Sequence, residues 1–299
     1  MKFMDSRRRA LLAVLAASVL PPAIAQTRRM TKPIPSTGEA LPVIGLGTWQ
    51  TFDARGDKTA QREVLKIFAE MGGRVVDSSP MYGAAESVVG ELSAALGLRD
   101  RLFMATKVWT SGAEGGVRQM EDSFQRMRVE RMDLMQVHNL LDVGTHTRTL
   151  REWKERNRVR YIGITHYSAS AHAEVERWLK AEAYDFLQIN YSLGERDAEK
   201  RLLPLCAERK VAVIANRPFA EGSLFRKVKG KPLPPWASEY GIESWAQYFL
   251  KWIVSHPAVT CAIPATANPA HVRDNLGAGR GGLPDAAARR RMAEYFSGL

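Results

Sequence analysis

The feature that most limits the fold of this chain is a regular alternation of short apolar runs with longer amphipathic stretches. Eight apolar runs are each followed by a segment whose apolar residues recur at helical spacing. Strands that alternate with helices build a parallel sheet, and eight such units favour a closed (β/α)8 barrel over an open sheet. The strands are predicted at residues 43–49, 74–79, 102–108, 131–139, 159–167, 186–192, 211–219 and 260–266.

Residues 33–299 are expected to form a single α/β barrel domain, because neither an internal repeat nor a linker interrupts them. Residues 221–240 contain three prolines and are expected to form a long loop beside the barrel mouth, where Trp236 could close over a site. A last helix, at residues 284–296, is expected on the barrel exterior. The other helices are predicted at residues 61–71, 85–96, 116–127, 147–157, 171–179, 198–210, 242–255 and 269–277.

The first 26 residues differ from the rest of the chain. Three arginines at 7–9 precede an uncharged apolar run of eleven residues at 10–20, and residues 23–25 supply an A-x-A cleavage site. These are the parts of a secretory signal, whose core is too short to span a bilayer. Arginines followed by two leucines resemble a twin-arginine export signal. We therefore expect residues 1–26 to be removed and the folded protein to reach the periplasm without stable membrane insertion. It stays cytoplasmic if the segment is not used as a signal.

Composition excludes some classes of partner. The net charge of +11 invites a nucleic-acid interpretation, but the lysines and arginines are scattered and no nucleic-acid-binding motif accompanies them. We expect no nucleic-acid partner. Cys206 lies in a helical pattern and Cys261 in an apolar strand, which favours two buried thiols over a disulfide. The sequence has no Cys/His cluster with metal-ligand spacing, and no metal is expected.

Four polar residues stand at or just after the ends of predicted strands, namely Asp77, Tyr82, Lys107 and His138. The C-terminal ends of barrel strands open onto one mouth, so these side chains are expected to converge there. An ammonium lowers the pKa of a neighbouring phenol, a carboxylate keeps that ammonium charged, and an imidazole orients a substrate oxygen or assists proton transfer. Such a group suits carbonyl reduction, in which the oxygen gains negative charge and must be protonated. The hydride must come from a nicotinamide or similar cofactor, because side chains do not supply it.

These residues lie in segments that resemble the aldo-keto reductases. Residues 77–90 match the family pattern D-[TS]-[AS]-x-x-Y-G-x-x-E-x-x-x-G. Residues 106–107 match the family strand that carries the lysine, and residues 136–138 match the strand that carries the histidine. Residues 45–49 match its first strand, and residues 263–264 with Asn275 match its closing cofactor segment. The resemblance runs from about residue 34 to the C-terminus. It implies NAD(P)H-dependent reduction of aldehydes or ketones by direct hydride transfer, with Tyr82 as the general acid. Lys107 and Asp77 would tune Tyr82, and His138 would orient the substrate.

The same resemblance implies a set of cofactor contacts. Near the end of the strand predicted at residues 159–167, Thr165–His166 stands where the family usually has Ser-Asn. In the strand predicted at residues 211–219, Asn216 stands where the family usually has an aromatic residue stacked on the nicotinamide. Many relatives hold the 2′-phosphate with a Lys and an Arg where Ala265 and His271 stand here, yet NADP(H) is still expected over NAD(H). The implied contacts are Gly47, Thr48 and Asp77 at the nicotinamide ribose, Thr165, His166, Gln188 or Asn190, and Asn216 at the nicotinamide, Arg217 at the pyrophosphate, and Thr266, Arg273 and Asn275 at the phosphate and adenine end.

Three apolar residues, Trp49, Met81 and Trp109, each follow a barrel strand and are expected to wall a pocket for a small carbonyl substrate. A second function class is a binding or regulatory module that uses the barrel as a nucleotide sensor with little turnover. The altered residues at 165–166 and 216 favour that alternative, whereas the complete set of four catalytic side chains opposes it.

Overall fold

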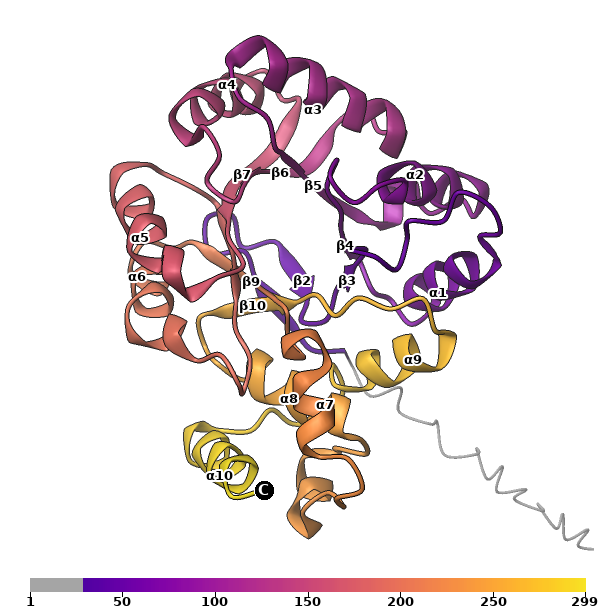
Figure 1. Ribbon diagram of the computed structural model, residues 1–299, viewed down its shortest axis with the longest axis vertical. Helices are drawn as coiled ribbons and strands as arrows, with labels where there is room; N and C mark the ends of the chain where they lie inside the picture. The colour runs from indigo at the N-terminus through magenta and orange to yellow at the C-terminus, as the bar shows by residue number, and fades with distance from the viewer. Residues whose placement is uncertain (1–28) are drawn as a thin grey trace, which may run out of the picture.

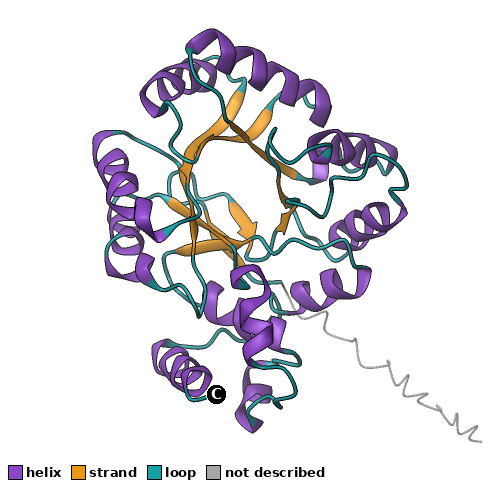
Figure 2. Ribbon diagram, in the orientation of Figure 1, coloured by secondary structure: helices purple, strands orange, loops and turns teal. Residues whose placement is uncertain are grey.

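The computed structural model describes residues 29–299, which form an eight-stranded parallel barrel inside a ring of helices (Figure 1, Figure 2). The expected export segment, residues 1–26, lies outside the described residues. Bridges from Ile44 to Ala262 and from Gly47 to Ala265 close the first barrel strand onto the last. The predicted (β/α)8 fold is confirmed. The strands are β3 (Leu46–Gly47), β4 (Val75–Asp77), β5 (Phe103–Val108), β6 (Met132–His138), β7 (Val159–Thr165), β8 (Phe186–Asn190), β9 (Ala212–Asn216) and β10 (Val259–Ala262).

Helices cover the outside of the barrel and follow its strands in turn (Figure 2). The last of them, α10, packs on the exterior as expected, because the Tyr248 hydroxyl of α8 donates to the Met292 carbonyl of α10 at 2.8 Å. The helices are α1 (Thr59–Glu70), α2 (Ala85–Ala95), α3 (Ala113–Met127), α4 (Val143–Glu155), α5 (His172–Ala181), α6 (Leu202–Glu208), α7 (Ser223–Lys227), α8 (Trp245–Val254), α9 (Pro269–Gly277) and α10 (Ala286–Ser297), with short turns η1 (Arg99–Arg101), η2 (Ala169–Ala171) and η3 (Asp197–Lys200).

Side chains alternate between the two faces of each barrel strand, as the two-residue period of a strand requires. On β5, Phe103 belongs to the inner apolar cluster, and Lys107 stands on the same face four residues later. On β6, Leu134 belongs to that cluster, and Gln136 and His138 follow it on the same face. The barrel interior is therefore apolar where the strands begin and polar at the mouth, where they end.

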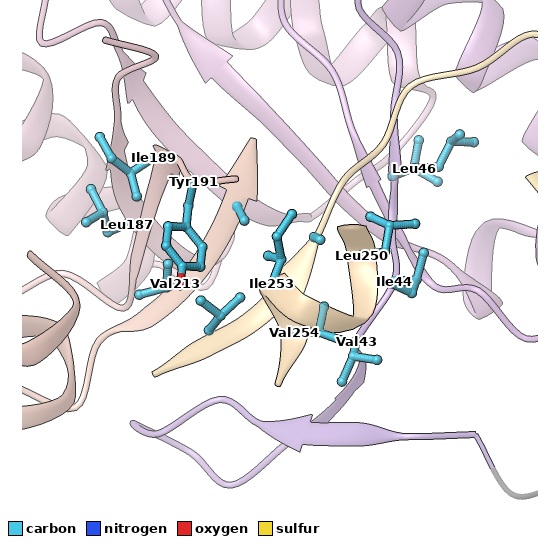
Figure 3. Close-up of a cluster of buried hydrophobic side chains, with 14 of the residues drawn as sticks. Val43, Ile44, Leu46, Leu187, Ile189, Tyr191, Val213, Leu250, Ile253 and Val254 are labelled. Carbon is cyan, nitrogen blue, oxygen red and sulfur yellow. The ribbon is translucent and has the colours of Figure 1, made fainter. Parts of the chain in front are cut away.

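The alternate residues pack between the sheet and the outer helices. Figure 3 shows part of this layer, in which side chains of β8 and β9 and of the segment entering β3 meet those of α8. Removing one such aliphatic side chain from water stabilises the fold by roughly 1.5–3 kcal/mol. This layer therefore holds the strands whose ends carry the polar residues. The labelled side chains, each at most 2% exposed, are Val43, Ile44, Leu46, Leu187, Ile189, Tyr191, Val213, Leu250, Ile253 and Val254.

A β-hairpin that the sequence patterns did not reveal precedes the barrel, made of β1 (Thr31–Pro33) and β2 (Ala40–Pro42). Ile34 and Leu41 are fully buried in the inner cluster, so the hairpin closes the end of the barrel opposite the mouth; β2 is seen inside the ring of strands in Figure 1. The Lys32 ammonium ties the hairpin to the last barrel unit by donating to the carbonyls of His256 and Val259, each at 2.7 Å.

Residues 221–240 are not a long loop, and that expectation is wrong. The segment contains α7 and the turns η4 (Ala220–Gly222) and η5 (Pro235–Tyr240). Pro235 takes the first position of its turn, where a backbone N–H would have no acceptor within the turn, so its lack of an N–H costs no hydrogen bond. The Trp236 ring packs 6.1 Å from the Tyr248 ring of α8 and 5.9 Å from the Tyr295 ring of α10. Trp236 therefore lies against the outer helices and does not cover the mouth.

Both cysteines are buried free thiols, as expected: Cys206 on α6 and Cys261 on β10. Burial raises the pKa of Cys206 to about 12, so this thiol stays protonated at neutral pH. Within residues 29–299, no helix has the length and apolar character needed to cross a membrane.

Candidate active site

A buried ion pair lies at the centre of the barrel mouth. The Lys107 ammonium is 2.6 Å from Asp77 Oδ2 and donates to the Ser78 carbonyl at 2.7 Å, and neither charged side chain is more than 3% exposed. Asp77 Oδ1 accepts two further bonds, from Gln188 Nε2 at 2.8 Å and Gln136 Nε2 at 3.2 Å. Because donors from β5, β6 and β8 meet on this carboxylate, Asp77 fixes the three strand ends relative to one another.

Tyr82 lies in the turn after β4, and the Lys107 ammonium faces its ring at 5.0 Å from the centroid. Burial raises the pKa of the Tyr82 phenol, the charge of Lys107 opposes this, and the charge of Asp77 adds to it. Lys107 thus acts on this pKa in the expected direction, but the net shift is upward. Desolvation of the phenolate outweighs the attraction of a cation that Asp77 largely neutralises. The phenol is therefore protonated at neutral pH, as a general acid must be.

His138 ends β6 and stands edge-on to Tyr82, with ring centroids 5.9 Å apart and planes at 84°. Burial lowers the pKa of His138 to about 2, assisted by the charges of Lys107 and His166, so the imidazole is neutral. His138 Nδ1 lies 3.0 Å from the hydroxyl of Ser79. Sequence reasoning did not assign a role to Ser79, although a polar residue between Asp77 and Tyr82 was a signal that could have been followed.

Four exposed apolar side chains rim the mouth. Trp49, Met81 and Trp109 are 43%, 39% and 41% exposed after β3, β4 and β5, and Tyr167 is 50% exposed two residues after β7. The Trp109 ring lies 6.4 Å from the His138 ring. Tyr167 was missed, although it follows its strand as Trp49 does. Exposed apolar groups of this size beside buried polar ones mark a ligand-binding surface.

The Trp109 backbone is held from both sides by one side chain. Gln119 of α3 accepts from the Trp109 N–H at 2.5 Å and donates to its carbonyl at 3.1 Å. The same loop is tied to α4, because Asp142 accepts from the Gly112 N–H at 2.8 Å. Trp109 is therefore a fixed wall of the mouth.

The predicted ribose contacts Gly47 and Thr48 join the first strand to its neighbours. A Cβ on Gly47 would lie 2.8 Å from the Ile263 carbonyl oxygen, so only glycine allows β3 to approach β10 this closely. The Thr48 hydroxyl is 3.0 Å from both the Asp77 carbonyl and the Ser78 hydroxyl. Both residues thus border the Asp77 side of the mouth.

The ends of β7 and β9 form a shelf beside the mouth. The His166 and Tyr167 rings stack at 5.2 Å with planes 8° apart, and Asn216 Nδ2 donates to the His166 carbonyl at 3.1 Å. Arg217 donates to the Tyr167 carbonyl at 3.2 Å and pairs with Glu221 at 3.3 Å. Asn216 Oδ1 is buried without a partner among the described residues. The shelf therefore presents an unused hydrogen-bond acceptor.

The remaining predicted contacts are on β8, β7 and the segment into α9. Thr165 donates to Gln188 Oε1 at 3.3 Å, next to the Asp77 network. Thr266 accepts from the Asn268 N–H at 3.0 Å, just before α9 begins. Asn275 is buried on α9, whereas Arg273 is exposed. The Gly47 to Ala265 bridge brings this segment to the same side of the barrel as Thr48.

The model of the Aldo/keto reductase family matches residues 43–290. The chain belongs to this family. It is 29% identical over 244 residues to methylglyoxal reductase YeaE of Escherichia coli, covering 79% of this chain and 84% of that protein. It is 27% identical to an aldo/keto reductase of Klebsiella pneumoniae solved with NADP and acetate, with a TM-score of 0.73 over 87% of this chain and 93% of that one. A structure of an aldo-keto reductase from the same organism with NADPH is similar at 27% identity and a TM-score of 0.73, covering 87% and 92%.

Two signature residues of this aldo/keto reductase serve packing. Glu86 of α2 is fully buried, accepts from the Thr106 hydroxyl behind β5 and pairs with Arg126 of α3 at 3.4 Å; burial raises its pKa. Gly90 lets α2 touch α3, because its Cβ would lie 2.0 Å from the Arg126 carbonyl oxygen. The E-x-x-x-G part of the signature thus places the strand that carries Lys107.

Proposed function

We propose that this aldo/keto reductase uses NADPH to reduce aldehydes or ketones to alcohols. The observation that carries the proposal is the buried Asp77–Lys107 pair beside Tyr82, whose ring stands edge-on to His138, at a mouth with an apolar rim. The names of the similar proteins support it, since one is a methylglyoxal reductase and two solved structures contain NADP or NADPH.

The side chains of the mouth have complementary roles in this reaction. NADPH supplies the hydride when bound. Tyr82 donates its phenolic proton to the carbonyl oxygen as that oxygen gains negative charge. Lys107, held charged by Asp77, stabilises the phenolate that Tyr82 leaves, and the neutral His138 donates a hydrogen bond that orients the same oxygen. The product alcohol carries the proton from Tyr82, which is replaced from solvent.

The shelf residues fit a nicotinamide. The unpartnered Oδ1 of Asn216 can accept from a carboxamide N–H, and Gln136 Oε1 is a second buried acceptor without a partner among the described residues. Gln188, Thr165 and His166 adjoin this position. At the other end, Thr266, Arg273 and Asn275 would hold the phosphate and adenine groups, with Arg217 near the pyrophosphate. The exposed cation of Arg273 supports NADP over NAD.

We also propose that residues 1–26 are a cleavable twin-arginine signal and that the protein acts in the periplasm. The basic and apolar parts of that segment and its A-x-A site support the proposal. Removal of residues 1–26 would leave the Met30 N–H bond to the Gly279 carbonyl, at 2.9 Å, intact. Fractionation of cells that express the full chain, with and without Arg7→Lys and Arg8→Lys, tests it. A protein that stays cytoplasmic at full length in both cases would refute export.

The reductase proposal is tested with purified residues 27–299. Fluorescence titration with NADPH and NADH measures cofactor binding, and turnover on a panel of aldehydes measures reduction. We expect Tyr82→Phe to lower kcat at least about a thousandfold while cofactor affinity stays within about twofold, because only the transferable proton is lost. A wild-type protein that binds NADPH yet reduces no carbonyl would favour the nucleotide-sensor alternative.

A further inference from the structure

We infer that Ser79 is a positioning residue that fixes the His138 imidazole in the tautomer with its proton on Nε2. The inference rests on the proposed carbonyl reduction, in which that proton is the hydrogen-bond donor to the substrate oxygen. The two side chains are 0% and 5% exposed, and Ser79 Oγ lies 3.0 Å from His138 Nδ1. They are 59 residues apart in sequence, so the barrel creates the contact.

The hydrogen bonds of Ser79 decide which atom donates. Its Oγ already accepts from the Met81 backbone N–H at 3.4 Å. Among the described residues, His138 Nδ1 is the other hydrogen-bond partner of this hydroxyl. If Nδ1 carried the proton, the buried hydroxyl hydrogen would have no acceptor, which is unfavourable. When Ser79 donates to a bare Nδ1, both groups are satisfied and the single proton of the ring is on Nε2.

The environment of the ring gives that proton a function. The imidazole is neutral and carries one N–H, so its position determines whether His138 can donate toward the mouth. No described residue forms a hydrogen bond with Nε2, and the centroid of the ring is 5.9 Å from that of Tyr82 and 6.4 Å from that of Trp109. Nε2–H is therefore free for a substrate oxygen next to the phenol that protonates it.

Ser79 is not required by the fold. The family pattern that residues 77–90 match admits alanine at this position, so Ser79→Ala removes the hydroxyl and leaves a residue that the turn accepts. Another buried serine provides a matched control. Ser93 of α2 is also 0% exposed, and its hydroxyl donates to the Gly90 carbonyl at 3.2 Å, with no contact to the mouth.

The tautomer is measured by nitrogen-15 NMR of histidine-labelled residues 27–299, without cofactor or substrate. We expect the wild type to show a protonated Nε2 and an unprotonated, hydrogen-bonded Nδ1 at His138. In Ser79→Ala the Nδ1 resonance should move and a fraction with Nδ1–H should appear, whereas Ser93→Ala should match the wild type. A wild-type proton on Nδ1, or identical His138 resonances in wild type and Ser79→Ala, would overturn the inference. This readout holds whether or not the protein reduces carbonyls.

Kinetics provide the second measurement. We expect Ser79→Ala to lower kcat for a given aldehyde roughly tenfold, the effect of one hydrogen bond on a barrier, with the NADPH dissociation constant unchanged. Ser79→Thr keeps the hydroxyl and should recover part of that rate, and Ser93→Ala should retain all of it. Equal kcat values in wild type and Ser79→Ala would contradict a positioning role. If the wild type itself reduced no aldehyde, that result would instead refute the proposed function.

Discussion

At the residue scale, Lys107 and His138 share one buried mouth yet have opposite charge states. Burial lowers the pKa of both groups, but the carboxylate charge of Asp77 and its hydrogen bond reverse this for Lys107, whose pKa is raised. The His138 ring has the Ser79 hydroxyl at 3.0 Å and the Lys107 cation nearby. None of its hydrogen bonds within the described residues is to a carboxylate. The mouth therefore combines a fixed cation with a neutral donor, the arrangement needed to stabilise a developing oxyanion.

The neutral His138 makes stability depend on pH. An unfolded histidine titrates near 6.5, whereas the folded pKa of His138 is about 2. Between these values the unfolded state binds a proton that the folded state does not, so the free energy of unfolding falls as pH is lowered, by up to about 1.4 kcal/mol per pH unit. When the pH is lowered from 6.5 to 5, we predict that the free energy of unfolding falls by about 1–2 kcal/mol less in His138→Gln than in the wild type. Urea unfolding at the two pH values measures this difference.

The exposed His271 supplies the control for that measurement. The free energy of unfolding of His271→Gln should fall by the same amount as that of the wild type when the pH is lowered from 6.5 to 5, because the His271 ring is exposed and makes no buried contact to lose. If all three proteins lost the same free energy over this pH interval, the assignment of a neutral, buried His138 would be wrong.

At the element scale, the position of β5 depends on how closely α2 and α3 pack behind it. Glycine within a helix weakens it by about 1 kcal/mol relative to alanine, so Gly90 in α2 needs a compensating reason. That reason is the backbone of α3, whose Arg126 carbonyl oxygen occupies the space of a Cβ. The same helix pair buries Glu86 against the Thr106 hydroxyl on β5.

We predict that Gly90→Ala lowers the free energy of unfolding by about 3 kcal/mol, because the two helices must separate. Gly115→Ala on α3 is the matched control. Its Cβ would meet Thr110 at 3.6 Å, an ordinary contact, and the gain in helix propensity should stabilise the protein by up to about 1 kcal/mol. Denaturant unfolding compares the two variants. Equal stability of both would show that α2 and α3 can adjust without strain.

At the scale of the whole molecule, the barrel mouth is polar at depth and apolar at its rim. Trp49, Met81, Trp109 and Tyr167 come from four separate loops and are brought together by closure of the barrel. A substrate with an apolar body can cover these side chains while its carbonyl reaches Tyr82. A small polar dicarbonyl compound makes no such contact.

We predict that kcat/KM for benzaldehyde exceeds that for methylglyoxal by roughly tenfold or more, since burying an aromatic ring against the rim contributes about 1.5–2.5 kcal/mol. Trp109→Ala should reduce this ratio severalfold. Trp178→Ala, which removes a tryptophan of α5 on the outer ring of helices, should leave the ratio unchanged. A higher kcat/KM for methylglyoxal in the wild type would show that the rim does not select the substrate.

Sequence reasoning located Asp77, Tyr82, Lys107 and His138 because strand periodicity and the common direction of barrel strands determine which side chains reach the mouth. It placed Trp236 wrongly, because a tryptophan in a proline-rich stretch packs wherever a complementary surface is available. Here the surface is formed by α8 and α10, two helices that follow it in the chain. The β1–β2 hairpin was missed because strands of three residues are too short to show a periodic pattern.

The sequence by itself determined the barrel, the order of its elements and the four side chains at its mouth, since these depend on local periodicity and strand direction. Only the tertiary structure decided how those side chains are protonated. The raised pKa of Tyr82, the neutral His138 and the hydroxyl of Ser79 against Nδ1 all depend on burial and on contacts between distant strands. Desolvation and non-local hydrogen bonds are properties of the packed barrel and have no counterpart in residue spacing.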